Sequence, residues 1–340
     1  MLMNSNPLNG WQVDRQRINF VGHDLERPEC IIAQPDGSLF TADARGGVME
    51  ISPNGQQRLL APLNATQGAA DFNQRYVQSA GASLPNGLAL TEAGDFIICN
   101  WGLDRVEQLD RQGNLQVLCD QLDGKPLGKT NFPLLDRHGR LWFTVTTTQQ
   151  PWTDSINSGV QDGYIAVMDE QGVRVAAEGF AGTNEIRFDD KEQWLYVVES
   201  NARRISRLRL RPDGSLGERE IFGPRELPGF PDGFAFDSFG NLWVTLIMSD
   251  LLIALTPDGD LLTLLDDGDP QATATLNAHY RARTLTPEVM QAARGSLAPW
   301  MASITFGGPD LRTVYLGSLM GTRIPCFRSP VAGQPLIHWR

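Results

Sequence analysis

The fold is decided by residues 84–100, which read LPNGLALTEAGDFIICN. The Pro-Asn-Gly start interrupts regular structure, and a short apolar run follows up to Leu90. A turn at Gly94 then leads into a second apolar run, Phe96 to Cys99. Leu, Ile and Phe in short runs bounded by turn residues favour paired β-strands. The segment therefore predicts a hairpin that begins at a polar residue, Asn86.

The same pattern recurs along the chain. A polar residue, here called the anchor, precedes a turn glycine by eight residues in four copies: Glu29 and Gly37, Asn86 and Gly94, Asn131 and Gly139, Asp232 and Gly240. Two further copies lack the glycine and begin at Asn184 and Ser303. Each copy continues into a third apolar segment and a fourth, outer one. Six four-stranded units are typical of a six-bladed β-propeller, an all-β fold, and we expect one closed domain over residues 1–340.

Closure of the ring needs an outer strand for the sixth blade, since a closed ring has no exposed sheet edge. Residues 11–21 read as a strand that precedes the first anchor, and we assign closure to them. The C-terminal residues 336–339, packed beside that strand, are the alternative. Residues 64–83, rich in Ala, Gln and Gly, are expected to form a loop.

Two longer insertions interrupt the repeat. Residues 146–155 are predicted to form a polar insertion between the second and third strands of blade three. This insertion is either a binding loop or a variable hairpin tip. Residues 266–301 precede blade six, and within them Thr286 and Pro287 start a stretch up to Ala293 that predicts a short helix. This helix either covers one mouth of the channel as a lid or packs on the outer rim.

Composition excludes several classes of partner. The net charge of −11, from 29 basic and 40 acidic residues, opposes binding to nucleic acids and to anionic membranes. No run of about 18 apolar residues and no signal-peptide pattern is present, so we expect a cytoplasmic protein. The oligomeric state is left open. The cysteines lie in apolar strand text without metal-site spacing, which predicts buried free thiols at Cys30, Cys99, Cys119 and Cys326.

Equivalent positions of a propeller lie near one another at its axis, so all six anchors should point into one pocket. Two of them, Glu29 and Asp232, are carboxylates, and the others carry amide or hydroxyl oxygen. An all-oxygen set of this kind suits Ca²⁺ and also accepts Mg²⁺ or Mn²⁺. The alternative is that these polar residues only satisfy backbone groups at the strand ends.

Two stretches carry a resemblance to a known family. Residues 230–237, FPDGFAFD, and residues 306–315, FGGPDLRTVY, together with the anchors, resemble the gluconolactonase, regucalcin and senescence-marker-protein family of six-bladed propellers. The resemblance covers about residues 20–330. It implies a lactone-opening hydrolase with one divalent metal ion, Ca²⁺ first and Mg²⁺, Mn²⁺ or Zn²⁺ as alternatives, and a small lactone or ester as substrate.

The resemblance also implies roles for individual residues. Asp232 is the implied general base as well as a metal ligand. The complete candidate metal set is Glu29, Asn131, Asn184 and Asp232. The candidate substrate contacts are Asn86, Asn131, Glu185 and Ser303. The chain departs from the family pattern at Glu185, where glycine is usual, and in having no arginine beside Asn131.

Other functions remain open at this point. No Gly-x-Ser-x-Gly elbow is present, and the four histidines fall outside the anchor positions. A metal-dependent lactonase is the leading hypothesis. The alternatives are a non-catalytic propeller that binds a small ligand or a protein, and another metal-dependent esterase or organophosphate hydrolase, because a fold alone does not specify a function.

Overall fold

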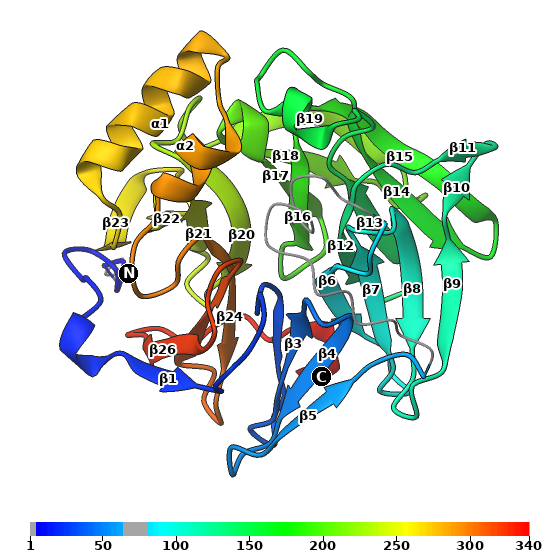
Figure 1. The fold of residues 1–340 in the computed structure, drawn as a ribbon, viewed down its shortest axis with the longest axis horizontal. Helices are drawn as coiled ribbons and strands as arrows, with labels where there is room; N and C mark the ends of the chain where they lie inside the picture. Colours follow the sequence, from blue (N-terminus) through cyan, green and yellow to red (C-terminus); the bar gives the residue numbers. More distant parts are fainter. Residues whose placement is uncertain (1–4, 64–80, 340) are drawn as a thin grey trace.

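The computed structural model describes residues 5–63 and 81–339, and these residues form six four-stranded antiparallel sheets around one axis (Figure 1). The predicted six-bladed β-propeller is therefore confirmed. From the axis outward, blades one to three are β2 (Ile31–Ala33), β3 (Leu39–Asp43), β4 (Gly47–Ile51) and β5 (Gln57–Leu60); β6 (Pro85–Leu90), β7 (Phe96–Asn100), β8 (Arg105–Leu109) and β9 (Leu115–Cys119); β12 (Thr130–Leu135), β13 (Leu141–Val145), β14 (Gly163–Asp169) and β15 (Gly172–Phe180).

Blades four to six follow the same order. They are β16 (Thr183–Phe188), β17 (Trp194–Glu199), β18 (Arg204–Leu210) and β19 (Leu216–Phe222); β20 (Phe230–Phe236), β21 (Leu242–Ile247), β22 (Leu251–Leu255) and β23 (Leu261–Asp266); β24 (Met301–Gly307), β25 (Thr313–Ser318), β26 (Ile324–Arg328) and β1 (Asn19–Val21). A small hairpin, β10 (Gln121–Leu122) and β11 (Lys125–Pro126), follows blade two. Most of the loop predicted for residues 64–83 lies outside the described residues.

The hairpin turns of blades three and five are built alike. Trp142 and Trp243 are fully buried, and each indole nitrogen donates to the aspartate that opens its turn. The Nε1–Oδ2 distance is 2.8 Å to Asp136 and 2.9 Å to Asp237. In these two blades one tryptophan and one carboxylate thus fix the hairpin geometry, and the carboxylate satisfies the buried indole nitrogen.

The N-terminal segment closes the ring. Strand β1 pairs antiparallel with β26, with Phe20 opposite Pro325, so closure by residues 11–21 is confirmed for its last three residues. Residues 15–17 form a 3₁₀ helix instead of strand. The alternative segment, 336–339, joins no sheet; it forms a 3₁₀ turn at Ile337–Trp339.

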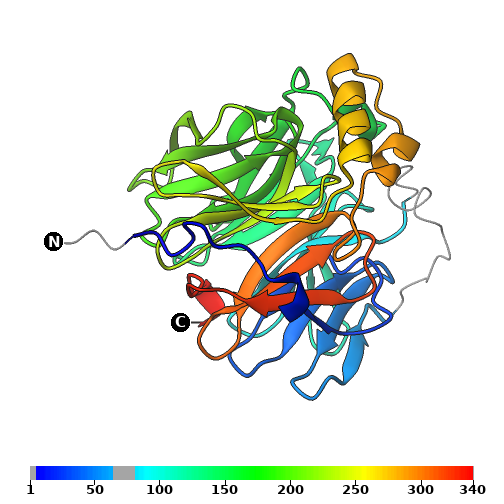
Figure 2. The same ribbon diagram turned by 90° about the vertical axis from the view of Figure 1, so that its left-hand side faces the viewer.

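The insertion before blade six holds two helices, α1 (Pro270–Ala282) and α2 (Pro287–Ala292). Helix α2 confirms the predicted helix, with Thr286 as its N-cap. Helix α1 was not predicted, although Asp269 caps it and proline opens its first turn. The two helices and the C-terminal segment lie on opposite faces of the ring (Figure 2).

Two further predictions can be compared with the fold. All four cysteines are buried and free, as predicted. Among the described residues, no helix combines the length and the apolar character that a membrane span requires.

Candidate active site

The anchors of blades two to five lie at irregularities of the innermost strands. Pro85 pairs with Asn100 and Leu88 with Ile98, so the two residues between them, Asn86 and Gly87, have no strand partners. The same skip occurs in β12, β16 and β20, and in each case the anchor is the first of the two skipped residues. Bulges of this type re-aim side chains. Here they occur next to the anchors, which line one cavity at the axis.

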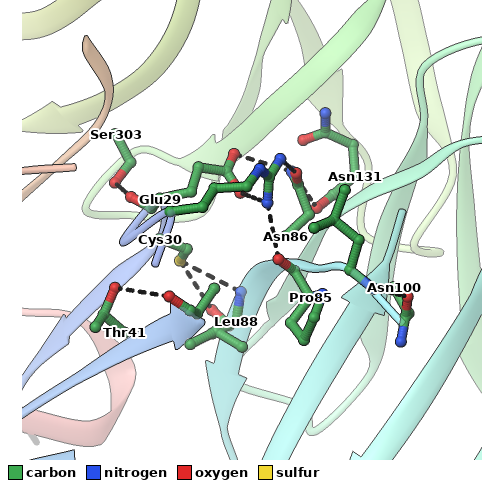
Figure 3. A network of polar contacts seen from close by, with 12 residues as sticks. Glu29, Cys30, Thr41, Pro85, Asn86, Leu88, Asn100, Asn131 and Ser303 are labelled. Atoms are coloured by element: carbon green, nitrogen blue, oxygen red, sulfur yellow. Dashed lines mark hydrogen bonds and ion pairs between the residues drawn. The ribbon is translucent and has the colours of Figure 1, made fainter. Parts of the chain in front are cut away.

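Blade six corrects the predicted register. Met301 and Ile304 pair with β25, so the skipped residues are Ala302 and Ser303. The position equivalent to the other anchors is therefore Ala302, and the sequence assignment was one residue too far along. Ser303 does not line the axial cavity, and its hydroxyl donates to the backbone carbonyl of Glu29 (Figure 3).

The second skipped residue is glycine in blades two and five because neighbouring blades touch there. A Cβ on Gly87 would lie 2.5 Å from the carbonyl oxygen of Asn131. A Cβ on Gly233 would lie 2.6 Å from the carbonyl oxygen of Ala302 and 2.7 Å from Oε1 of Glu185. Glu185, the equivalent residue of blade four, thus uses space that Gly233 leaves free. Glu185 does not line the cavity. Its predicted contact with the substrate stays a prediction, and this position does not favour it.

The cavity encloses about 60 Å³, room for a few water molecules, and it has two chemically different parts. Its polar floor consists of the five polar anchors Glu29, Asn86, Asn131, Asn184 and Asp232. Its apolar wall consists of Trp101, Trp152, Ile156, Phe230, Ile247, Met248, Met290, Trp300 and Leu319. The remaining lining residues are Arg27, Thr146, Ser200 and Asn201.

Asn86 connects one side of the floor. Its Nδ2 donates to Oε1 of Glu29 at 2.9 Å and to the backbone carbonyl of Asn131 at 3.3 Å (Figure 3). Its Oδ1 accepts from Nη2 of Arg27 at 2.5 Å, and Nη1 of Arg27 donates to the carbonyl of Pro85 at 2.9 Å. Asn86 is therefore placed to orient Glu29 rather than to offer its own oxygen to a ligand.

Asn184 and Asp232 form the other side of the floor. Nδ2 of Asn184 donates to Oδ1 of Asp232 and to Oγ of Ser200, the latter at 3.1 Å. These two donations orient the amide. Three floor atoms, Oε2 of Glu29 and Oδ1 of Asn131 and of Asn184, are buried and accept no hydrogen bond in the described structure.

The buried carboxyl groups near the axis outnumber the arginine side chains that lie beside them. Burial raises the pKa of Glu29 to about 7, although Arg27, 3.6 Å away, counteracts this shift. Burial also raises the pKa of Glu185 to about 7, against the opposing effect of Arg187 at 3.1 Å. The pKa of Asp232 rises well above its usual value, through burial first and then through the charges of Glu29 and Glu185. A cation at the floor would relieve this crowding.

Comparison with known proteins now identifies the family. Residues 28–286 match the family described as SMP-30/Gluconolactonase/LRE-like region. The chain belongs to this family. This match agrees with the family resemblance found in the sequence.

Individual relatives are distant. A 6-deoxy-6-sulfogluconolactonase from Pseudomonas putida is 26% identical over 232 residues, which are 67% of this chain and 67% of that protein. An adipocyte plasma membrane-associated protein from Rattus norvegicus is 25% identical over 263 residues, 74% of this chain and 66% of that protein. The chain thus spans about two thirds of the length of these curated relatives.

Solved structures share the fold. A gluconolactonase from Xanthomonas campestris has a TM-score of 0.63 at 18% identity, covering 92% of this chain and 89% of its own. Regucalcin from Agrobacterium tumefaciens, a calcium-binding protein, has a TM-score of 0.66 at 15% identity, covering 94% and 98%.

The floor residues fit the divalent cation that this family implies. The three oxygen atoms without hydrogen-bond donors belong to three of the four predicted ligands, Glu29, Asn131 and Asn184. A buried oxygen atom that accepts no hydrogen bond is costly, and a hard cation would satisfy it. The described residues contain no group of three or more His, Cys, Asp or Glu side chains suited to a metal. The predicted set has only two carboxylates and would depend on amide oxygens for the rest.

Several cavity residues were not found from the sequence. Arg27 lies two residues before the first anchor and outside the repeat, with a left-handed backbone, φ +57°. Trp152 and Trp300 come from the two insertions, and no repeat position marks them. His23, six residues before Glu29, is exposed; its ring contacts Asp24 and does not line the cavity.

Proposed function

We propose that this protein is a divalent-metal-dependent lactonase, which opens a cyclic ester by attack of water on its carbonyl carbon. One observation carries the proposal: buried oxygen atoms without donors line a single axial cavity together with Asp232. Membership of the gluconolactonase-type family supports a lactone as the substrate, as does the sulfogluconolactonase relative.

Glu29, Asn131, Asn184 and Asp232 would hold the cation, and Ca²⁺ suits this all-oxygen set best, with Mg²⁺, Mn²⁺ and Zn²⁺ as alternatives. A bound divalent ion would polarise the lactone carbonyl and stabilise the negative charge that develops on its oxygen. Asn86 would keep Glu29 in position through its 2.9 Å hydrogen bond.

Asp232 would act as the general base. Asn184 donates to its Oδ1 and so fixes the carboxylate. The ionised carboxylate would take a proton from the attacking water. Buried beside Glu29, Asp232 has a raised pKa, and a neighbouring cation lowers it again and keeps the base ionised near neutral pH.

The test is hydrolysis of a panel of lactones and esters by chelator-treated protein, before and after addition of each single metal. We expect at least one lactone to be hydrolysed, activity to disappear with chelator, and one metal to restore it. Absence of hydrolysis with every metal would overturn the proposal and favour a non-catalytic ligand-binding propeller. Turnover of organophosphates without any lactone would favour the organophosphate hydrolase.

A further inference from the structure

The cavity wall is more apolar than a sugar lactone requires. Half of the residues around the cavity are apolar, and three of them are tryptophans. Trp101 and Trp152 meet edge to face, with 5.3 Å between ring centroids. These side chains belong to one hydrophobic cluster that also includes residues of both insertions. The region above the floor is therefore continuous with a packed hydrophobic core.

Three polar side chains beside this wall already donate hydrogen bonds to backbone carbonyls. Oγ1 of Thr146 and Oγ of Ser200 donate to backbone carbonyls at 2.7 and 2.6 Å. Nδ2 of Asn201 donates to the carbonyl of Ser155 at 2.8 Å. A polyhydroxylated lactone would place hydroxyl groups beside these three side chains, whose donors are already engaged, and hydroxyl groups buried without partners weaken binding.

Blade six adds to this asymmetry. Its residue at the anchor position is Ala302, which carries no side-chain oxygen and belongs to the same hydrophobic cluster as the wall. Trp300, two residues earlier, lines the cavity, and its indole nitrogen donates to the carbonyl of Met290 at 3.1 Å. The indole thus presents its carbon surface without a free donor.

From this arrangement we infer that the substrate is a lactone with an alkyl or aryl substituent, not a polyhydroxylated sugar lactone. The inference rests on the proposed lactonase function. The ring carbonyl lies on the polar floor, and the substituent lies against the wall formed by Trp101, Trp152 and Trp300. Each methylene buried there strengthens binding by about fourfold.

The first experiment measures binding without catalysis. Lactams resist hydrolysis, so a δ-lactam with a pentyl side chain is compared with gluconolactam by quenching of tryptophan fluorescence and by calorimetry, with and without Ca²⁺. We expect the alkyl lactam to bind at least about tenfold more tightly. Equal affinity, or tighter binding of gluconolactam, would overturn the inference.

A variant pair locates the effect in the wall. Trp152→Gln places an amide in the wall. It should reduce the ratio of the affinities for the alkyl lactam and for gluconolactam about tenfold, chiefly because the alkyl lactam binds more weakly. Trp194→Gln, in the second strand of blade four and outside the cavity, should leave the ratio unchanged. If Trp152→Gln does not fold, Ile156→Thr makes the same test with a smaller change in volume. If the wall variants and the wild type had the same affinity ratio, the alkyl substituent would not bind against this wall, and the inference would be overturned.

The outcomes separate this inference from the proposed function. Hydrolysis rates are measured for δ-decalactone and glucono-δ-lactone with each metal. Metal-dependent turnover of glucono-δ-lactone alone would keep the lactonase and overturn the apolar substrate. Tight binding of the alkyl lactam without hydrolysis of any lactone would keep the apolar ligand and overturn the lactonase.

Discussion

The polar floor and the apolar wall of the cavity come from different kinds of sequence. The floor is built from the repeat: the innermost strands of blades two to five each supply one side chain from the same structural position, and Glu29 lies just before the innermost strand of blade one. Much of the wall comes from the two segments that interrupt the repeat, through Trp152 and Ile156 in blade three and Met290 and Trp300 before blade six. The floor is set by the blades, whereas the wall is set partly by the blades and partly by their insertions.

The difference separates chemistry from selectivity. Strand positions in adjoining blades hold side chains rigidly, as a metal site and a base require. Insertions on a scaffold change without altering the blades, and they determine which substituent is accommodated. Variants of the floor should therefore abolish the reaction, whereas variants of the wall should change substrate preference or stability by smaller amounts.

The largest effect is expected for Asp232→Asn. The amide keeps an oxygen that can coordinate a cation, but it cannot accept a proton from water. General-base catalysis contributes about 10²–10⁴-fold in rate, so kcat should fall by roughly that factor while metal binding remains measurable. Steady-state kinetics and calorimetric metal titration check both values.

A carboxylate-to-amide control comes from the outer part of blade three. Asp169→Asn removes a carboxylate paired with Arg174, far from the floor, and should leave kcat unchanged. Near wild-type kcat in Asp232→Asn would eliminate this residue as the base. Joint loss of metal binding and activity would make it chiefly a ligand, with the base to be sought at Glu185 or at a metal-bound hydroxide.

Glu29→Gln should weaken metal binding. The substitution keeps the shape of the side chain and removes one of only two carboxylates in the predicted set. Because loss of even an indirect partner of a metal site costs about 10–100-fold in affinity, we expect at least about 100-fold here. Metal titration followed by calorimetry is the measurement. Glu50→Gln, on an outer strand, is the matched control, and wild-type affinity in Glu29→Gln would refute the ligand assignment.

The sequence predicted the floor better than the wall for a physical reason. The eight-residue spacing from Asn86 to Gly94 recurs because every blade folds into the same hairpin, so position along the strand gives position in space. Ser303 was placed wrongly because Phe306 pairs with Val314 whereas Phe236 pairs with Leu242, which makes the blade-six hairpin two residues longer. Without a turn glycine, nothing in the sequence marked that difference.

The insertions follow no such rule. Leu276 is the one buried residue that helix α1 contributes, with Ala272 and Tyr280 packed beside it, so its narrow apolar face gives only a weak signal in the sequence. Trp152 and Met290 reach the cavity through tertiary packing against Trp101 and Trp300. A sequence without a repeat at these positions cannot report such contacts.

The buried carboxyl groups at and beside the floor should make stability depend on pH when no cation is present. The pKa values of Glu29 and Glu185 rise from 4.5 to about 7, so the folded state retains protons that the unfolded chain has released. The free energy of unfolding should be highest below about pH 4.5 for these groups and fall as pH rises through about 7. One such carboxyl is worth on the order of 3 kcal/mol.

Urea unfolding at intervals from pH 5 to 8, with chelator and with saturating Ca²⁺, measures this dependence. The decline should be present with chelator and largely absent with Ca²⁺, because the bound cation compensates the carboxylates. Glu29→Gln removes one titrating group and should flatten the decline in chelator. Parallel pH profiles with and without Ca²⁺ would show that the floor does not bind the ion.

The smallest predicted effect concerns the attachment of the helical insertion. Oη of Tyr280 on α1 donates to the carbonyl of Asn201 at 2.6 Å, and Arg203 lies against the tyrosine ring at 4.0 Å. Tyr280→Phe removes one hydrogen bond and keeps the ring contact, so it should cost about 1 kcal/mol of unfolding free energy.

Asn201 lines the cavity beside the wall, whereas Asp232 and Glu29 are held by hydrogen bonds that do not involve α1. Metal affinity and kcat for a small lactone should therefore stay within about twofold of wild type, while KM for a lactone with a long alkyl chain rises. Urea unfolding measures the change in stability, and metal titration and steady-state kinetics measure the other values. A loss of metal affinity in this variant would mean that floor and wall are energetically coupled and that the insertion also supports the chemistry.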